Sequence, residues 1–187
     1  MAYIKEVIVT TTNLNGDVKI SPLGIHVISK SEIHIKPFKP SRTLNNLKEC
    51  PYGVINYISD IKIFASCILR EELDLKKVKA EKIKGYRLKE ALAHSEFKVI
   101  KVQEDEIRPT FICKILHEEN HEMYKGYNRA QNSILEMCIL VSRLGIIDIN
   151  KINKEMNYLR IAVEKTANED DLIIWEKLKE KIDKYEA

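Results

Sequence analysis

The chain has 187 residues, of which 44% are hydrophobic and 32% are charged, a composition typical of one globular domain or of one domain with an appendage. No apolar run reaches the roughly 18–20 residues that cross a bilayer, and the chain does not open with a secretory signal, so we expect a soluble cytoplasmic protein without a membrane partner. The net charge of +3 arises from 31 basic and 28 acidic residues, which does not favour a nucleic acid partner.

The first 60 residues have the features of β structure. Strands are predicted over residues 4–12, 18–28, 32–38 and 52–58. Asn15-Gly16 predicts a tight hairpin between the first two, because a type I′ turn needs positive φ at both central residues. Pro22 and Gly24 weaken a regular ladder and indicate either a bulge or a close backbone approach to a ligand.

The middle of the chain is less regular. After a break at Lys39-Pro40-Ser41, residues 43–49 predict a short helix that Ser41 or Thr43 could cap. Residues 61–69 are apolar enough for either a helix or a strand, and residues 71–90 are a charged insertion of open structure. Two further strands are predicted over residues 97–102 and 110–116.

From about Tyr124 the apolar spacing changes to the 3.6-residue period of helices. Three helical stripes follow, represented by Ile134, Cys138 and Val141, by Ile152, Met156 and Val163, and by Trp175, Leu178 and Ile182. The fold class is therefore predicted as α+β, mainly β. A small β-barrel domain is expected over residues 1–122, with a C-terminal helical segment over residues 123–187 packed on it.

Ser41-Arg42-Thr43 lies at a predicted strand-to-helix turn, where unpaired backbone N–H groups and the helix dipole favour an anion. Two hydroxyls and a guanidinium suit a phosphate monoester, and Asn46 lies one turn later on the same face. An equally good interpretation is that Ser41 and Thr43 only cap the helix and that Arg42 is a surface residue. Ser21-Pro22-Leu23-Gly24 offers backbone amides on which the polar edge of a flat ring could lie.

Several short motifs follow one another in a fixed order. They are Thr10-Thr11-Thr12-Asn13, Asn15-Gly16, Ser21-Pro22-Leu23-Gly24, Ser41-Arg42-Thr43-Leu44-x-Asn46, Val54-Ile55-Asn56 and Asn128-Arg129-Ala130. This order resembles the FMN-binding split β-barrel of flavin-reductase-like proteins, and it is most similar to a largely archaeal branch of that family. The resemblance covers nearly the whole chain, and the order of the motifs is more specific than any one of them.

The resemblance implies a homodimer that binds FMN near the subunit interface. The phosphate would be held by Ser41, Arg42, Thr43 and Asn46. The ribityl chain and ring would be lined by Thr11, Thr12, Asn13, Ser21, Pro22, Leu23 and Gly24, with Phe38 and Lys39 beside the cofactor. Arg129 would reach the site from the helical part, or would form a salt bridge on the helix surface.

The implied function is FMN binding by a flavin-dependent oxidoreductase that acts on an unknown small molecule. The alternatives are a non-catalytic flavin-binding or electron-carrier protein and an unrelated phosphate-binding module. No acid–base or nucleophile set stands out, which suits a flavin because the cofactor itself carries the redox chemistry.

We expect no metal site, because His117 and His121 are spaced four apart without a third ligand in view. His26 and His34 are predicted as a cross-hairpin pair or as surface residues. The four cysteines form no CxxC pair, and Cys67, Cys113 and Cys138 are predicted as core thiols.

Overall fold

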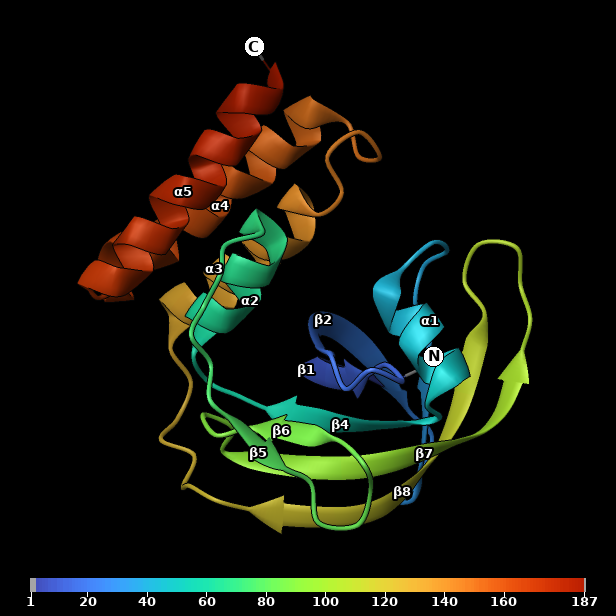
Figure 1. The fold of residues 1–187 in the computed structure, drawn as a ribbon. Helices are drawn as coiled ribbons and strands as arrows, with labels where there is room; N and C mark the ends of the chain where they lie inside the picture. Colours follow the sequence, from blue (N-terminus) through green and yellow to red (C-terminus); the bar gives the residue numbers. More distant parts are fainter. Residues whose placement is uncertain (1–2, 187) are drawn as a thin grey trace. The chain divides into compact units, whose positions relative to one another are not determined.

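The computed structural model describes residues 3–186, and these residues form eight strands and five helices (Figure 1). Strands hold 33% of the residues and helices 36%, so the predicted α+β class is confirmed, with helices as prominent as strands. The chain folds into two compact units. The first ends at Ser59 and resumes over Asp74–Tyr124, and the second comprises Asp60–Leu73 and the chain from Lys125 onward.

The first unit is a closed antiparallel barrel of six strands. They are β1 (Tyr3–Thr12), β2 (Val18–Val27), β3 (Glu32–Ile35), β4 (Tyr52–Tyr57), β7 (Ala93–Gln103) and β8 (Thr110–Asn120). Their order around the barrel is β1-β2-β3-β8-β7-β4, and β4 pairs back onto β1. Because side chains alternate along a strand, one face of each strand fills the interior. The barrel core includes Val9, Ile35, Ile55, Phe97 and Phe111, all fully buried.

Helix α1 (Arg42–Glu49) packs against the same core. Leu44 and Leu47 lie three residues apart, so they share one helix face, and both are buried in the barrel cluster. The opposite face, which includes Asn45 and Lys48, is exposed. The predicted short helix is therefore confirmed.

The loop between β1 and β2 forms the predicted hairpin but not with the predicted turn. Only Gly16 has positive φ, at 89°, whereas a type I′ turn needs it at Asn15 as well. Asn13 explains the difference, because its backbone N–H donates to the Asp17 carbonyl oxygen at 3.1 Å. The Asp17 N–H in turn donates to Asn13 Oδ1 at 2.8 Å, so the side chain of Asn13 closes a wider loop.

Strand β2 has one paired edge and one largely open edge. It pairs with β1 at every residue from Val18 to Val27 without a register shift, so the bulge considered from Pro22 and Gly24 is absent. Within residues 3–186, its other edge meets β3 only at His26 and Val27. The edge of β2 before His26 therefore faces no strand of the described chain.

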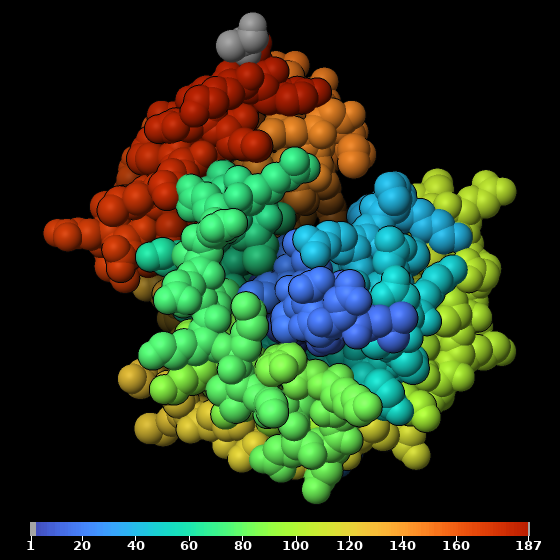
Figure 2. All heavy atoms as spheres, viewed as in Figure 1, coloured from blue at the N-terminus to red at the C-terminus, as the bar shows by residue number. Residues whose placement is uncertain are grey.

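The charged insertion folds into a small hairpin of β5 (Lys77–Lys79) and β6 (Tyr86–Leu88). It lies on the outer face of β1 and β4: Thr10 Oγ1 donates to the Tyr86 carbonyl oxygen, and the Leu88 N–H donates to Asn56 Oδ1 at 2.7 Å. Figure 2 shows the light-green hairpin region beside the blue β1 region on the surface of the barrel unit.

The second unit is helical. It contains α2 (Ile61–Leu69), α3 (Arg129–Val141), α4 (Ile149–Thr166) and α5 (Glu169–Glu186), and α2 packs against α3 and α5. Asp60 caps α2 by accepting the Lys62 N–H at 2.9 Å, which resolves the ambiguous segment as a helix. The unit thus takes in residues 60–73, which lie inside the range that the sequence assigned to the barrel. No helix of the described chain combines the length and apolar character needed to span a membrane.

Candidate cofactor site and a buried histidine cluster

Four polar side chains that were predicted to contact a cofactor meet where α1 packs on the barrel. Ser21 Oγ lies 2.8 Å from Thr43 Oγ1, and Asn46 Nδ2 donates to Thr11 Oγ1 at 3.1 Å. All four side chains are buried. They tie α1 to β1 and β2, and because a hydroxyl has one donor and two lone pairs, the Ser21–Thr43 pair keeps one O–H to donate.

The first turn of α1 carries a positively charged side chain, Arg42, that could bind an anion. Ser41 is the N-cap, with extended φ and ψ of −152° and 149°, and its Oγ accepts the Leu44 N–H at 3.3 Å. Arg42 is exposed, and its guanidinium has no hydrogen bond or ion pair with any other residue between 3 and 186. The first N–H groups of a helix have no partner within the helix, so this turn joins free backbone donors to a free positive charge.

The predicted ring-binding residues of β2 lie along its open edge. Pro22 pairs with Ile8, Leu23 packs against the barrel core, and Gly24 lies opposite Glu6. A Cβ at Gly24 would lie 3.0 Å from Glu6 Oε1, so the missing side chain leaves room for that carboxylate.

Of three other predicted site residues, two contact side chains outside the predicted site and the third lies in the helical unit. The Phe38 ring is exposed and lies 4.2 Å below the Arg108 guanidinium, and Lys39 Nζ donates to Glu104 Oε2 at 3.1 Å. Arg129 is the exposed first residue of α3 in the helical unit.

A cavity of about 590 Å³ lies at the other end of α1. Its lining includes the predicted residues Thr12 and Asn13, together with Tyr52, Lys79 and Tyr86. Eight helical residues span about 12 Å, so the cavity and the Ser41 turn are separated by the length of α1.

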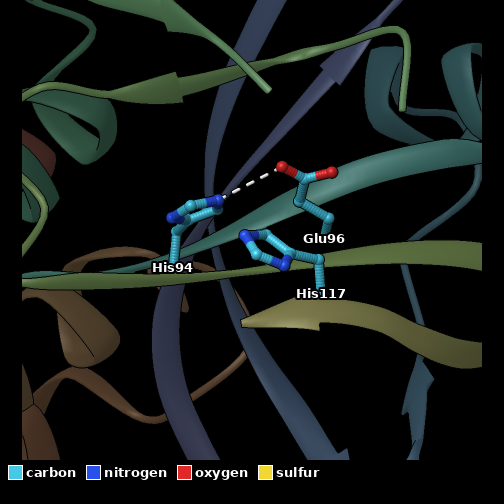
Figure 3. Close-up of side chains that lie close together, drawn as sticks. All are labelled: His94, Glu96 and His117. Atoms are coloured by element: carbon cyan, nitrogen blue, oxygen red, sulfur yellow. Dashed lines mark hydrogen bonds and ion pairs between the residues drawn. The ribbon is translucent and has the colours of Figure 1, made fainter. Parts of the chain in front are cut away.

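A second polar cluster lies on the outer wall of the barrel, where β7 and β8 pair. His94 and Glu96 are two residues apart on β7, and His117 on β8 is the cross-strand partner of Glu96. Figure 3 shows their polar ends turned toward one another. His94 Nε2 lies 3.2 Å from Glu96 Oε1, and His94 Nδ1 lies 2.8 Å from His121 Nε2.

The Glu96 side chain is fully buried and its two oxygens are held by backbone donors. The N–H groups of Glu81 and Lys82 donate to it at 2.6 and 2.8 Å. Burial alone would raise the pKa of the Glu96 carboxyl, but these hydrogen bonds and the one from His94 outweigh burial and lower the pKa below its ordinary value.

Sequence reasoning missed this cluster. The strand was predicted to begin at Phe97, whereas β7 begins at Ala93, so His94 and Glu96 fell outside it. The available signal was the i, i+2 spacing of two ionisable side chains beside an apolar strand, which places both on one face. The predicted cross-strand pairing of His26 with His34 is confirmed.

Two protein-family models match the chain. One, described as the N-terminal domain of a protein of unknown function (DUF447), matches residues 5–122, and one described as a protein of unknown function (DUF447) matches residues 128–180. No curated protein matches the chain.

Solved structures match over most of the chain. An FMN-bound protein from Methanosarcina mazei has a TM-score of 0.78 at 19% identity over 97% of this chain and 96% of that one. A protein from Shewanella frigidimarina described as a putative flavin reductase has a TM-score of 0.56 at 12% identity, over 68% of this chain and 75% of that one. Flavoredoxin of Desulfovibrio vulgaris has a TM-score of 0.53 at 18% identity, over 65% of this chain and 73% of that one. The predicted split-barrel fold is confirmed.

Proposed function

The chain belongs to the DUF447 family, and from this premise we propose that it binds FMN and acts as a flavin-dependent oxidoreductase on a small molecule. The observation that carries the proposal is the contact between Ser21 and Thr43, which brings the open edge of β2 next to the first turn of α1. A phosphate and a flat polar ring need those two features side by side. The FMN-bound protein from Methanosarcina mazei, similar over 97% of this chain, supports the same cofactor.

The phosphate is proposed to lie at the first turn of α1. Arg42 supplies an unpaired guanidinium, which binds a phosphate through charge-assisted hydrogen bonds. The Ser41 hydroxyl accepts from the Leu44 N–H but keeps its own O–H to donate. Thr43 and Asn46 would act mainly by fixing the helix to the barrel, through Ser21 and Thr11.

The ribityl chain and ring are proposed to lie along the open edge of β2, from Ser21 to Gly24. Proline has no N–H and is confined to the edges of sheets, so Pro22 accords with an edge that no other strand occupies. The backbone groups of Leu23 and Gly24 would then provide the polar contacts.

A homodimer with FMN near the interface is the proposed assembly, because an exposed helix turn and an open strand edge cover the cofactor from one side only. Phe38 and Lys39 would contribute to the covered site. We propose a cytoplasmic location, since Cys50, Cys67, Cys113 and Cys138 form no disulfide with one another, as expected of cysteines in a reducing compartment.

The chemistry would come from the flavin, which accepts and donates electrons once bound. This chain would bind and orient it. A second candidate function is electron transfer without turnover of a substrate, which the similarity to flavoredoxin favours.

A visible absorption spectrum of the purified protein, before and after addition of FMN, tests the proposal. We expect one bound FMN per chain, either in the protein as purified or after FMN is added. A colourless protein that takes up no FMN would contradict the proposal and would favour an unrelated phosphate-binding module. Anaerobic addition of NADH or NADPH then separates the two functions, since reduction by either favours the oxidoreductase and no reduction favours the carrier.

A further inference from the structure

The histidine cluster on the outer wall of the barrel has no part in the proposed flavin site. His94 and Glu96 are 1% and 0% exposed, beneath the loop that follows β5. The register of β7 and β8 shifts immediately after Glu96. Such irregularities are common beside functional sites, where they redirect side chains.

Two groups of the cluster, the Glu96 carboxylate and His117 Nε2, have few side-chain partners. Among the residues that the structure describes, His94 is the only side chain that pairs with the buried Glu96 carboxylate. A buried carboxylate is stable when a cation accompanies it. His117 Nε2 is buried without a hydrogen bond, and its nearest charged neighbour, Glu81 Oε2, is 3.5 Å away. A buried nitrogen without a hydrogen bond, next to a buried carboxylate that has one side-chain partner, is an arrangement that a bound cation would satisfy.

We propose that His94, Glu96 and His117 bind a divalent transition metal ion, with Zn²⁺ as the best fit. One ligand atom from each of the three side chains lies within 4.8 Å of the other two. Two imidazoles and one carboxylate form a known ligand set for zinc that leaves a fourth position open. Ligands at about 2.0–2.1 Å around a tetrahedral ion lie about 3.3–3.5 Å apart, close to the 3.2 Å between His94 Nε2 and Glu96 Oε1.

The groups around this set can orient it. With its Nδ1–H donated to His121 Nε2, at 2.8 Å, His94 would present the lone pair of Nε2 to the ion. The Glu81 N–H donates to Glu96 Oε1, the oxygen that lies next to His94 Nε2, and the Lys82 N–H donates to Oε2, so both oxygens are held in place. The ion can enter past Glu81, whose side chain is 52% exposed and which could supply or orient the fourth ligand.

A second set of side chains, His94, Glu119 and His121, is also close together. It is the weaker choice because His94 and His121 already bond to each other and Glu119 is exposed. An ion held by His94, Glu96 and His117 would connect β7 and β8 at a point where the β5–β6 loop is also fixed. Its role would be to stabilise the barrel wall.

The test is a titration of the full chain, without an affinity tag and freed of metal by a chelator, with Zn²⁺ in a calorimeter and with Co²⁺ in a spectrophotometer. We expect one ion per chain with a dissociation constant below about 1 μM for Zn²⁺. Ligand-field bands of tetrahedral Co²⁺ should appear and should be displaced by Zn²⁺. The melting temperature should rise with added Zn²⁺, as for any ligand that binds only the folded state.

Substitution of one ligand should weaken the binding without unfolding the protein. His117→Gln is the first choice because its side chain is 22% exposed, and we expect Zn²⁺ affinity to fall by about 100-fold or more. His34→Gln is the matched control, since His34 is 21% exposed on the same barrel and should leave the affinity unchanged. Glu96→Gln extends the test to the carboxylate. Its control is Glu118→Gln, because Glu118 follows His117 on β8 and its side chain lies on the opposite face of that strand.

Absence of Zn²⁺ binding by the unsubstituted chain would overturn the proposal and would leave the cluster as a hydrogen-bonded network. Equal affinities of the His117→Gln variant and the original chain, with both folded by circular dichroism, would overturn it as well. Flavin content plays no part in these readouts, so the result is independent of FMN binding.

Discussion

Ser21 Oγ and Thr43 Oγ1 lie 2.8 Å apart, and this one contact joins the open edge of β2 to the first turn of α1. Both side chains are buried, so the distance between the helix turn and the strand edge is fixed by the barrel core. A cofactor that spans the two features would meet a preformed surface, which reduces the ordering cost of binding.

Replacement of Arg42 by alanine should weaken FMN binding by about 1.5–3 kcal/mol, the scale of a hydrogen bond to a charged group. Riboflavin, which lacks the phosphate, should bind the variant and the original chain equally. Quenching of flavin fluorescence measures both affinities. Arg160→Ala removes an exposed arginine whose partner is Glu164 and should change neither. Equal losses for FMN and riboflavin in the Arg42→Ala variant would show that Arg42 does not contact the phosphate.

Replacement of Gly53 by alanine should destabilise the barrel by about 1–3 kcal/mol, because the core is already filled at this point. An added Cβ would lie 2.5 Å from Phe97 Cζ and 3.1 Å from the Thr10 carbonyl oxygen. Gly85→Ala is the control, since its Cβ would meet Ile83 Cδ1 at an ordinary 3.5 Å. Urea unfolding of both variants gives the two free energies, and similar values would contradict the crowding at Gly53.

Replacement of Asn56 by alanine should cost about 2–3 kcal/mol of stability, because it leaves buried polar groups without partners. The Asn56 amide donates to the Ile8 carbonyl oxygen and to Thr10 Oγ1, each at 3.2 Å, and accepts the Leu88 N–H at 2.7 Å. The exposed residue Asn45 provides the control Asn45→Ala, which should change the free energy of unfolding by less than about 0.5 kcal/mol. Hydrogen exchange should also speed up at the Leu88 amide in the Asn56 variant alone.

The thiols of Cys113 and Cys138 should resist alkylation in the folded protein. Burial raises the pKa of each to about 12, so at pH 8 nearly all of either thiol is protonated and unreactive. Cys50 and Cys67 are only half-buried and should react before the other two. Treatment with iodoacetamide, followed by mass spectrometry of the peptides, ranks the sites. Labelling of Cys113 in the folded chain as fast as in urea would contradict this ranking.

Much of the fold follows from local patterns in the sequence. Alternating and helical spacing of apolar residues predicted β1, β2, α1 and the three C-terminal helices, because each element buries one regular face. The turn between β1 and β2 was predicted with the wrong geometry, because the pairing of Asn13 with Asp17 competes with the preference of Asn15-Gly16.

The remaining features depend on contacts between distant parts of the chain. The β5–β6 hairpin has little apolar surface of its own and is held by Thr10 and Asn56, which belong to the barrel wall. The histidine cluster needs the register of β7 against β8, which no short window of sequence contains. Of the candidate flavin site, sequence motifs predicted the turn and the strand, whereas the open edge of β2 emerged only from the sheet pairing.

The position of α2 within the chain affects the order of folding during synthesis. Its partners begin at Arg129, about 60 residues after α2 ends at Leu69, which at roughly 5–20 residues per second is a delay of about 3–12 s. During that time the apolar side chains of Ile61, Ile63 and Phe64 have no helices to cover them, and chaperones can bind them. A chain truncated after Tyr124 would lack α3 and α5, so we expect these side chains of α2 to stay exposed in it.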